Sequence, residues 1–89
     1  MEVTEGIYLV YGITDCPACL RACADLMEKE KQYVFIETDF SSEYRSFIKK
    51  AFGWDTFPII LRTSKDGDVL LGGYSELKEI LYHEPKSPD

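Results

Sequence analysis

Two cysteines separated by two residues, in the run Cys16-Pro17-Ala18-Cys19, are the residues of this chain best suited to chemistry. They follow an apolar, β-type run over 7–11 and precede a stretch with helical periodicity. A strand, a short loop, a CxxC run and a helix is the arrangement of a dithiol that exchanges with disulfides. The sequence therefore predicts a reaction, thiol–disulfide exchange, in addition to a fold.

The expected position of the two thiols suits this reaction. The thiolate is the reactive form of cysteine, and the free N–H groups and positive dipole end of a helix N-terminus stabilise it. Because Pro17 favours the first helical position, we expect Cys16 at the N-cap and Cys19 one turn inside, within disulfide reach. The loop over 12–15 is expected to leave Cys16 at the surface, where a substrate disulfide can reach it.

Length and composition indicate one small domain. The chain has 89 residues, of which 45% are hydrophobic, enough for a single core. No run of about 18 apolar residues predicts a membrane span, and the acidic start over 1–5 lacks the features of a signal peptide. Three cysteines, an odd number, fit a disulfide-stapled secreted scaffold poorly. We therefore expect a cytoplasmic protein with no membrane association.

The net charge of −6 argues against nucleic acid as a partner. The two close pairs of lysines, Lys29 with Lys31 and Lys49 with Lys50, each lie near acidic residues, so the sequence predicts no basic patch. We therefore expect no binding to DNA or RNA.

Hydrophobic periodicity predicts the secondary structure. Strands are expected over 7–11, 33–36, 58–61 and 69–71, and helices over 17–31, 41–52 and 75–82. The helix residues expected to face the core are Leu20, Cys23, Ala24 and Met27, then Tyr44, Phe47, Ile48 and Phe52, then Leu77, Ile80 and Leu81. Asp39 or Ser41 is expected to cap the second helix and Gly53 to end it. A hairpin turn is expected over 65–68.

The element order is therefore βαβαββα, typical of the α/β class. A strand–helix–strand opening implies a parallel pair with a right-handed crossover, and the later hairpin adds an antiparallel pair. The result is a four-stranded mixed sheet flanked by helices, the thioredoxin-like fold. We expect a single domain over 1–82 and a flexible C-terminal tail over 83–89, which holds two prolines.

In three motifs the chain resembles the glutaredoxin family. The first is Tyr11 followed five residues later by the CxxC run, the second is Thr56-Phe57-Pro58, and the third is Gly-Gly-Tyr-Ser-Glu over 72–76. A CxxC run alone is common in zinc sites, but the three motifs in this order are specific. The resemblance covers nearly the whole domain and implies a glutaredoxin-like fold.

The resemblance also implies a role for each matching residue. Cys16 is the expected nucleophile and Cys19 the expected resolving thiol. Pro58 is expected to be a cis-proline beside the dithiol, and the backbone of Phe57 is expected to meet a bound peptide-like thiol. A helix N-terminus binds a carboxylate, and the γ-glutamyl end of glutathione is expected at four residues there, Gly73, Tyr74, Ser75 and Glu76. The residues expected to support the site structurally are Tyr11, Pro17 and Thr56.

Several positions depart from the family pattern. Family members often have lysine three residues before the first cysteine, where this chain has Ile13. They often have a basic residue just before the Thr-x-Pro motif, where this chain has Asp55. Ala18 stands where tyrosine is common, and Glu76 where the third motif usually ends in aspartate. Because Asp15 and Asp55 are acids close to the site, we expect a less stabilised nucleophile thiolate and weaker glutathione binding than is typical. Three cations of the second expected helix could replace the missing ones, namely Arg45, Lys49 and Lys50.

Other interpretations of the same residues remain open. The two thiols could be half of a tetrahedral zinc site, with Cys23 and His83 as the other candidates, or could bind an iron–sulfur cluster in a dimer that shares glutathione. Cys23 fits either a small buried residue or a third thiol open to glutathionylation. Trp54, Phe57 and Tyr74 could form an apolar platform through which a non-catalytic adaptor binds a protein.

The favoured function is a dithiol oxidoreductase that reduces protein disulfides or glutathione mixed disulfides and is recharged by glutathione. A thioredoxin-like donor recharged by thioredoxin reductase is the alternative within the same fold. The resemblance implies ribonucleotide reductase and glutathionylated proteins as partners and glutathione as co-substrate. We expect no metal, no tightly bound cofactor and a monomer.

Overall fold

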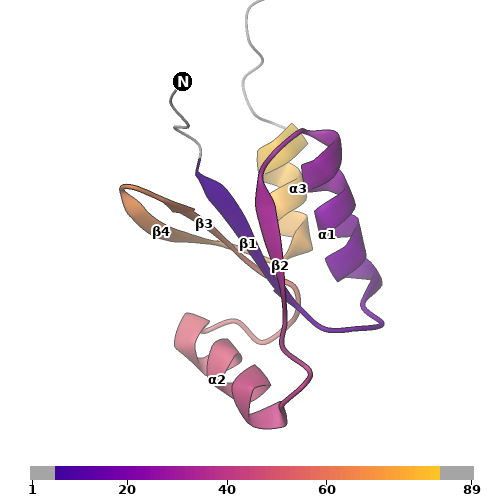
Figure 1. The fold of residues 1–89 in the computed structure, drawn as a ribbon, viewed down its shortest axis with the longest axis vertical. Helices are drawn as coiled ribbons and strands as arrows, with labels where there is room; N and C mark the ends of the chain where they lie inside the picture. The colour runs from indigo at the N-terminus through magenta and orange to yellow at the C-terminus, as the bar shows by residue number, and fades with distance from the viewer. Residues whose placement is uncertain (1–5, 83–89) are drawn as a thin grey trace, which may run out of the picture.

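A computed structural model describes residues 6–82, and its elements follow the predicted order βαβαββα (Figure 1). The strands and helices are β1 (Ile7–Gly12), α1 (Pro17–Glu28), β2 (Tyr33–Glu37), α2 (Ser42–Phe52), β3 (Ile59–Ser64), β4 (Gly67–Gly72) and α3 (Tyr74–Tyr82). The tail predicted over 83–89 lies outside the described residues. In the described part of the chain, no helix is long and apolar enough to cross a membrane.

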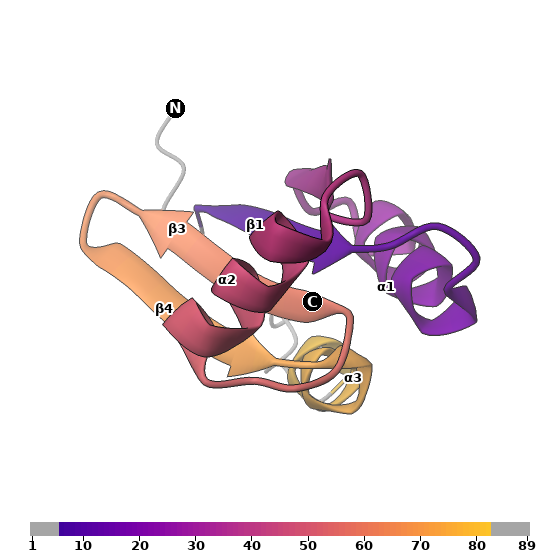
Figure 2. The same ribbon diagram turned by 90° about the horizontal axis from the view of Figure 1, so that it is seen from below.

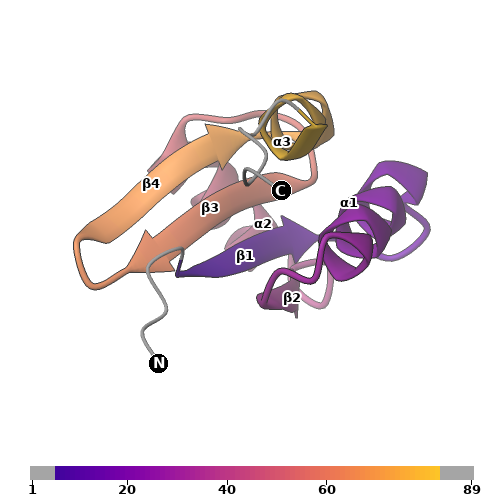
Figure 3. The ribbon, with the colours of Figure 1, turned by 90° about the horizontal axis from the view of Figure 1, so that it is seen from above.

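The four strands form one mixed sheet in the order β2-β1-β3-β4. β1 is parallel to β2 and antiparallel to β3, and β3 and β4 form an antiparallel hairpin. The parallel pair arises because the α1 crossover returns the chain to the same end of the sheet. α1 and α3 lie on one face of the sheet and α2 lies on the other, as Figure 2 and Figure 3 show. The predicted thioredoxin-like fold is confirmed.

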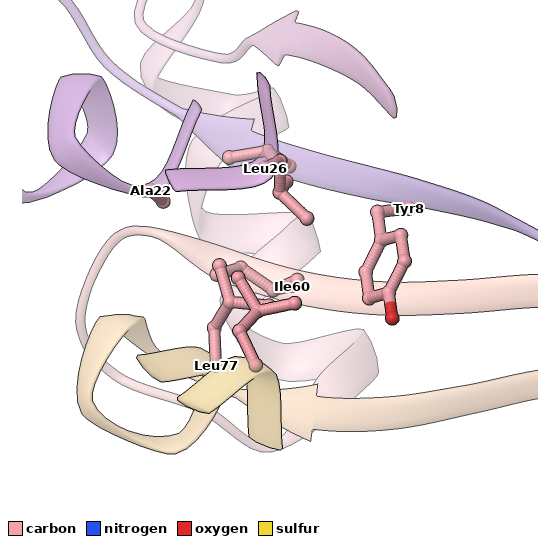
Figure 4. Packing of buried hydrophobic residues seen from close by; sticks show 7 residues of the cluster. Tyr8, Ala22, Leu26, Ile60 and Leu77 are labelled. Carbon is pink, nitrogen blue, oxygen red and sulfur yellow. The ribbon is translucent and has the colours of Figure 1, made fainter. Parts of the chain in front are cut away.

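Two small cores hold these layers together, because successive side chains of a strand point to opposite faces. The α1/α3 core contains Tyr8 and Ile60 of the sheet with Leu26 and Leu77 of the helices (Figure 4). The α2 core joins Ile48 to two buried residues of β3. The central strands β1 and β3 are therefore held from both faces, and they position the loops at their ends.

The first helix ends earlier than predicted. α1 ends at Glu28 rather than at residue 31. Glu30 takes a left-handed conformation with φ 59°, and the Lys31 N–H donates a hydrogen bond of 2.9 Å to the Leu26 carbonyl. This bond closes the helix end and turns the chain toward β2.

The face of α1 that packs on the sheet also differs from the prediction. Three of the four residues expected in the core are exposed, Leu20, Ala24 and Met27, and the fourth, Cys23, is half-buried. The residues that are buried instead are Cys19, Ala22 and Leu26. Both sets are apolar at three- and four-residue spacing, so α1 carries two apolar stripes, and the sheet and α3 cover one of them.

Ser41, not Asp39, caps α2, and its Oγ accepts a hydrogen bond of 3.1 Å from the N–H three residues later. Gly53 ends the helix in the left-handed conformation, as predicted. Of the residues expected in the core, Ile48 is fully buried. Phe47, by contrast, is 63% exposed, so its predicted place in the core is wrong.

The other boundaries shift by a few residues. β3 begins after Pro58 and continues to Ser64, since β4 pairs with it from Ile60 to Ser64, with a shift of register between Ile60 and Leu61. In α3, Leu77 and Leu81 are buried as predicted, whereas Ile80 is half-buried. None of these shifts moves the loops that carry the sequence motifs.

Candidate active site

Cys16 is the N-cap of α1, as the sequence predicts. Its backbone is extended, with φ −125° and ψ 97°, and its Sγ accepts a hydrogen bond of 3.2 Å from the Cys19 N–H. Pro17 follows at the start of the helix, where the missing N–H of proline costs no hydrogen bond, because N–H groups in the first turn have no helical partner. Cys16 and Cys19 form a disulfide with their Cα atoms 5.2 Å apart. The structure therefore shows the oxidised form of a dithiol at a helix N-terminus.

The dithiol is less exposed than the sequence predicts. Cys16 is 9% exposed and Cys19 is fully buried. The surface position predicted for Cys16 is wrong because the cap geometry turns its sulfur back onto the first turn of α1. Of the two cysteines, only Cys16 keeps some exposed surface, which favours its sulfur as the one that a substrate reaches.

The three sequence motifs meet at one end of the sheet, where β1 and β4 end and β3 begins. Strand pairing places Tyr11 opposite Ile59 and Ile60 opposite Gly72, so the end of β1, the start of β3 and the end of β4 are neighbours. The CxxC loop, the Thr-Phe-Pro segment and the Gly-Gly turn leave the sheet at these three points. Tyr11 itself packs in the α2 core, with its ring centroid 5.4 Å from that of Phe52.

The Phe57–Pro58 peptide bond is cis, as the family resemblance implies, and Pro58 is buried. Phe57 is half-buried against the α2 core, and Lys49 Nζ lies 5.5 Å from its ring centroid. Asp55 and Thr56 are exposed. A cation of α2 therefore does lie beside the Thr-Phe-Pro segment.

The predicted glutathione-binding turn is closed in part by its own side chains. The Gly73 N–H donates a hydrogen bond of 2.9 Å to Glu76 Oε1, so Glu76 caps the start of α3. A Cβ added at Gly73 would lie 3.4 Å from Trp54 Nε1 and 3.5 Å from the Pro58 carbonyl oxygen. Trp54 and Pro58 thus border the turn, while Ser75 is exposed.

Tyr74 does not join an apolar platform with Trp54 and Phe57. Its ring packs against the α1/α3 core, and its hydroxyl donates a hydrogen bond of 2.8 Å to Asp25 Oδ2. Desolvation and the Asp25 carboxylate raise the pKa of Tyr74, because both disfavour the phenolate. Trp54 and Phe57 pack on the opposite face, against the α2 core. The three-residue platform is therefore not formed.

Two residues after β2 hold the loop that precedes Cys16, and neither was predicted as a site residue. Thr38 donates to the Gly12 carbonyl from its N–H, at 2.8 Å, and from its Oγ1, at 3.0 Å. Thr14 donates to Asp39 Oδ2 from its N–H, at 3.0 Å, and from its Oγ1. Thr14 and Asp39 are 25 residues apart in the chain, and no local pattern marks the pair.

Cys23 is a free, half-buried thiol that packs against the α1/α3 core. Burial raises its pKa, which favours the unreactive thiol form. Between residues 6 and 82, no group of three or more His, Cys, Asp or Glu side chains could hold a metal ion. His83, the other zinc ligand considered, lies outside that range.

Comparison with known proteins agrees with this geometry. A family model described as Glutaredoxin matches residues 8–63, and no curated protein matches the chain. The solution structure of glutaredoxin from Brucella melitensis is 26% identical, with a TM-score of 0.75 over 94% of this chain and 87% of that chain. The glutaredoxin-like protein NrdH-redoxin from Escherichia coli is 17% identical and shares the fold, with a TM-score of 0.66 over 92% of this chain and 99% of that chain. The chain therefore belongs to the glutaredoxin family.

Proposed function

We propose that this protein reduces protein disulfides or glutathione mixed disulfides through Cys16 and Cys19 and is recharged by glutathione. The observation that carries the proposal is the cap geometry, in which Cys16 Sγ lies 3.2 Å from a first-turn N–H of α1 and within bonding reach of the second sulfur. Such N–H groups stabilise a thiolate. The proposed substrates include ribonucleotide reductase and glutathionylated proteins. The protein is proposed to work as a cytoplasmic monomer without a metal or a tightly bound cofactor.

The proposed reaction is a series of thiol–disulfide exchanges. The Cys16 thiolate attacks one sulfur of a substrate disulfide, forms a mixed disulfide and expels the other sulfur as a thiolate. The Cys19 thiol then loses its proton, attacks the Cys16 sulfur and expels the second substrate thiolate, which leaves a Cys16–Cys19 disulfide. One glutathione thiolate opens this bond as a mixed disulfide on Cys16. A second releases oxidised glutathione and restores the Cys16 thiolate.

Two features support glutathione as the reductant. The first turn of α3 offers N–H groups at Tyr74 and Ser75, without helical partners, for the γ-glutamyl carboxylate. Lys49 lies beside Phe57 and supplies a cation for the glycyl carboxylate of glutathione. This cation replaces the basic residues that the family often has at the positions of Ile13 and Asp55. The two charged ends of glutathione thus have separate partners around the Thr-Phe-Pro segment.

A thioredoxin-type donor, recharged by thioredoxin reductase, is the second candidate. The bond from the Gly73 N–H to Glu76 Oε1 favours it, because glutathione must compete with this contact. Ile13 and Asp55 favour it as well, since neither offers a positive charge to glutathione. NrdH-redoxin, which shares the fold, has a thioredoxin-like activity profile.

The test is reduction of a small glutathione mixed disulfide, followed as NADPH consumption with glutathione and glutathione reductase. A parallel assay replaces both with thioredoxin reductase. We expect turnover with glutathione that is lost in Cys16→Ser. Turnover with thioredoxin reductase alone would reassign the electron source. Absence of NADPH consumption in both assays would contradict the oxidoreductase proposal and favour a non-catalytic adaptor or a cluster-binding protein.

Replacing Lys49 with alanine is expected to raise the KM for a glutathione mixed disulfide about three- to tenfold with little change in kcat, because one solvent-screened charge contact is lost. Steady-state kinetics in the glutathione-coupled assay measure both constants. Lys65→Ala is the matched control, since it removes the same charge from the β3–β4 turn at the other end of the hairpin. The assignment of Lys49 fails if the two variants have equal KM values.

A further inference from the structure

Four hydrogen bonds tie the loop before Cys16 to the residues that follow β2. Thr38 donates two of them to the Gly12 carbonyl, and Thr14 donates the other two to Asp39 Oδ2. Thr38 is fully buried, so its pair of bonds is part of the folded core. In the Thr14–Asp39 pair, Thr14 is exposed and Asp39 is half-buried, so a substitution at Thr14 can remove a bond without opening the core.

The Asp39 carboxylate is held as an anion. Its side-chain and backbone hydrogen bonds from Thr14 lower the pKa of Asp39 to about 2, because they stabilise the charged form. Glu37 is the other carboxyl group that interacts with Asp39, and a hydrogen bond to Asp39, together with its charge, raises the pKa of Glu37. Asp39 therefore accepts from Thr14 as a charged group at any pH at which the dithiol reacts, and charge-assisted bonds are the stronger ones.

The hydrogen bonds from Thr14 to Asp39 form a clamp on the loop before Cys16. Asp15 lies between Thr14 and Cys16 and has a left-handed φ of 55°. Residues other than glycine rarely adopt this conformation, and it persists where the surroundings hold it. Here the chain is held on both sides, because Asp39 fixes Thr14 and the helix start fixes Cys16 as its N-cap. Releasing Thr14 removes one of these two restraints.

We propose that Asp39 is a positioning residue for Cys16: it holds Thr14 and thereby aims Cys16 Sγ at the Cys19 N–H. This inference rests on the proposed role of Cys16 as the nucleophile. Without the clamp, the loop samples orientations in which the sulfur leaves the N–H, and the reduced thiolate loses that stabilisation. The negative charge of Asp39 acts in the opposite direction, since a nearby anion raises the pKa of a thiol.

The geometric effect of Asp39 outweighs its charge. The carboxylate contacts Thr14, two residues before Cys16, and not the Cys16 sulfur. Physiological salt screens charges over a Debye length of about 8 Å, so a charge outside contact distance of the thiol changes its pKa by about 0.2 units. Loss of a helix-cap contact changes it by about one unit. Asp39→Ala therefore raises the pKa of Cys16. Asp39→Asn removes the charge but keeps an acceptor oxygen for Thr14, so it keeps the restraint on the loop with weaker, neutral bonds.

The test measures the thiolate in the full chain carrying Cys19→Ser and Cys23→Ser, so that Cys16 alone reacts. The rate of alkylation by iodoacetamide as a function of pH gives the pKa of Cys16. We expect Asp39→Ala to raise this pKa by about one unit, and so to lower the alkylation rate about tenfold below the pKa. Asp39→Asn is expected to stay within about 0.3 units of the parent. Asp66→Ala, in the β3–β4 turn, is the matched control and should leave the pKa unchanged.

Two results would overturn the proposal: an unchanged pKa in Asp39→Ala, or an equal rise in Asp39→Asn. Thr14→Val guards against a folding defect in Asp39→Ala, because it removes one of the two donors at an exposed position. It is expected to raise the pKa by about half as much, and an unchanged value would contradict the clamp. Circular dichroism and thermal midpoints verify that each variant is folded. Because alkylation needs neither a reductant nor a disulfide substrate, this proposal and the proposed function can fail separately.

Discussion

Turnover in the glutathione-coupled assay is expected to fall at least about a thousandfold when Cys16 is replaced by serine. A hydroxyl at this N-cap accepts the same hydrogen bond as the sulfur, but it does not ionise near neutral pH and cannot form a disulfide. Cys19 is fully buried and cannot take over the attack. Initial rates at matched protein concentration measure the loss.

The companion variants separate the roles of the three thiols. Cys19→Ser is expected to keep reduction of glutathione mixed disulfides, because glutathione can resolve the Cys16 adduct directly. The same variant should accumulate a stable adduct on Cys16 with a protein disulfide substrate, detectable by mass spectrometry. Cys23→Ser is the control and should retain parental activity, since burial raises the pKa of that thiol. Substantial activity in Cys16→Ser would show that another thiol is the nucleophile.

The features that could be predicted from the sequence are those encoded in contiguous residues. The apolar run that became β1 pairs with both of its neighbours, and Gly53 ends α2 in the conformation that glycine adopts most easily. The CxxC run lies at a helix start because Pro17 can begin a helix but cannot continue one. The cis bond before Pro58 was expected only from the resemblance to the glutaredoxin family, and the structure has it.

The features that could not be predicted depend on which distant segments come into contact. α1 has two apolar stripes, and its sequence does not say which one the sheet and α3 will cover. Glu76 bonds to the Gly73 N–H of its own turn, a contact that was not predicted from the sequence, while its expected contact with glutathione stays a prediction. Thr14 and Asp39 meet only because parallel pairing brings the ends of β1 and β2 together. In each case the residue type allows several partners, and the tertiary fold selects one.

Gly12→Ala is expected to destabilise the oxidised protein by about 1–3 kcal/mol, because a methyl group has no space at this position. A Cβ there would lie 2.7 Å from Phe35 Cε1 and 2.9 Å from Cys19 Sγ, closer than real contacts allow. The backbone of Gly12 does not have a positive φ, so the predicted cost is steric and not conformational. Urea unfolding of the oxidised protein measures the change in free energy.

The close approach also explains why glycine belongs at the end of β1. Because Gly12 has no side chain, the Phe35 ring of the edge strand and the Cys19 sulfur both lie close to its backbone. Shortening Phe35 to alanine should therefore reduce the cost of Gly12→Ala, and a double-mutant cycle measures this coupling. Gly73→Ala is the matched control, since its added Cβ meets its nearest neighbours at 3.4–3.5 Å, an ordinary contact distance. Equal costs at Gly12 and Gly73, or additivity with Phe35→Ala, would mean that the end of β1 can move aside and that packing does not fix the Cys19 sulfur.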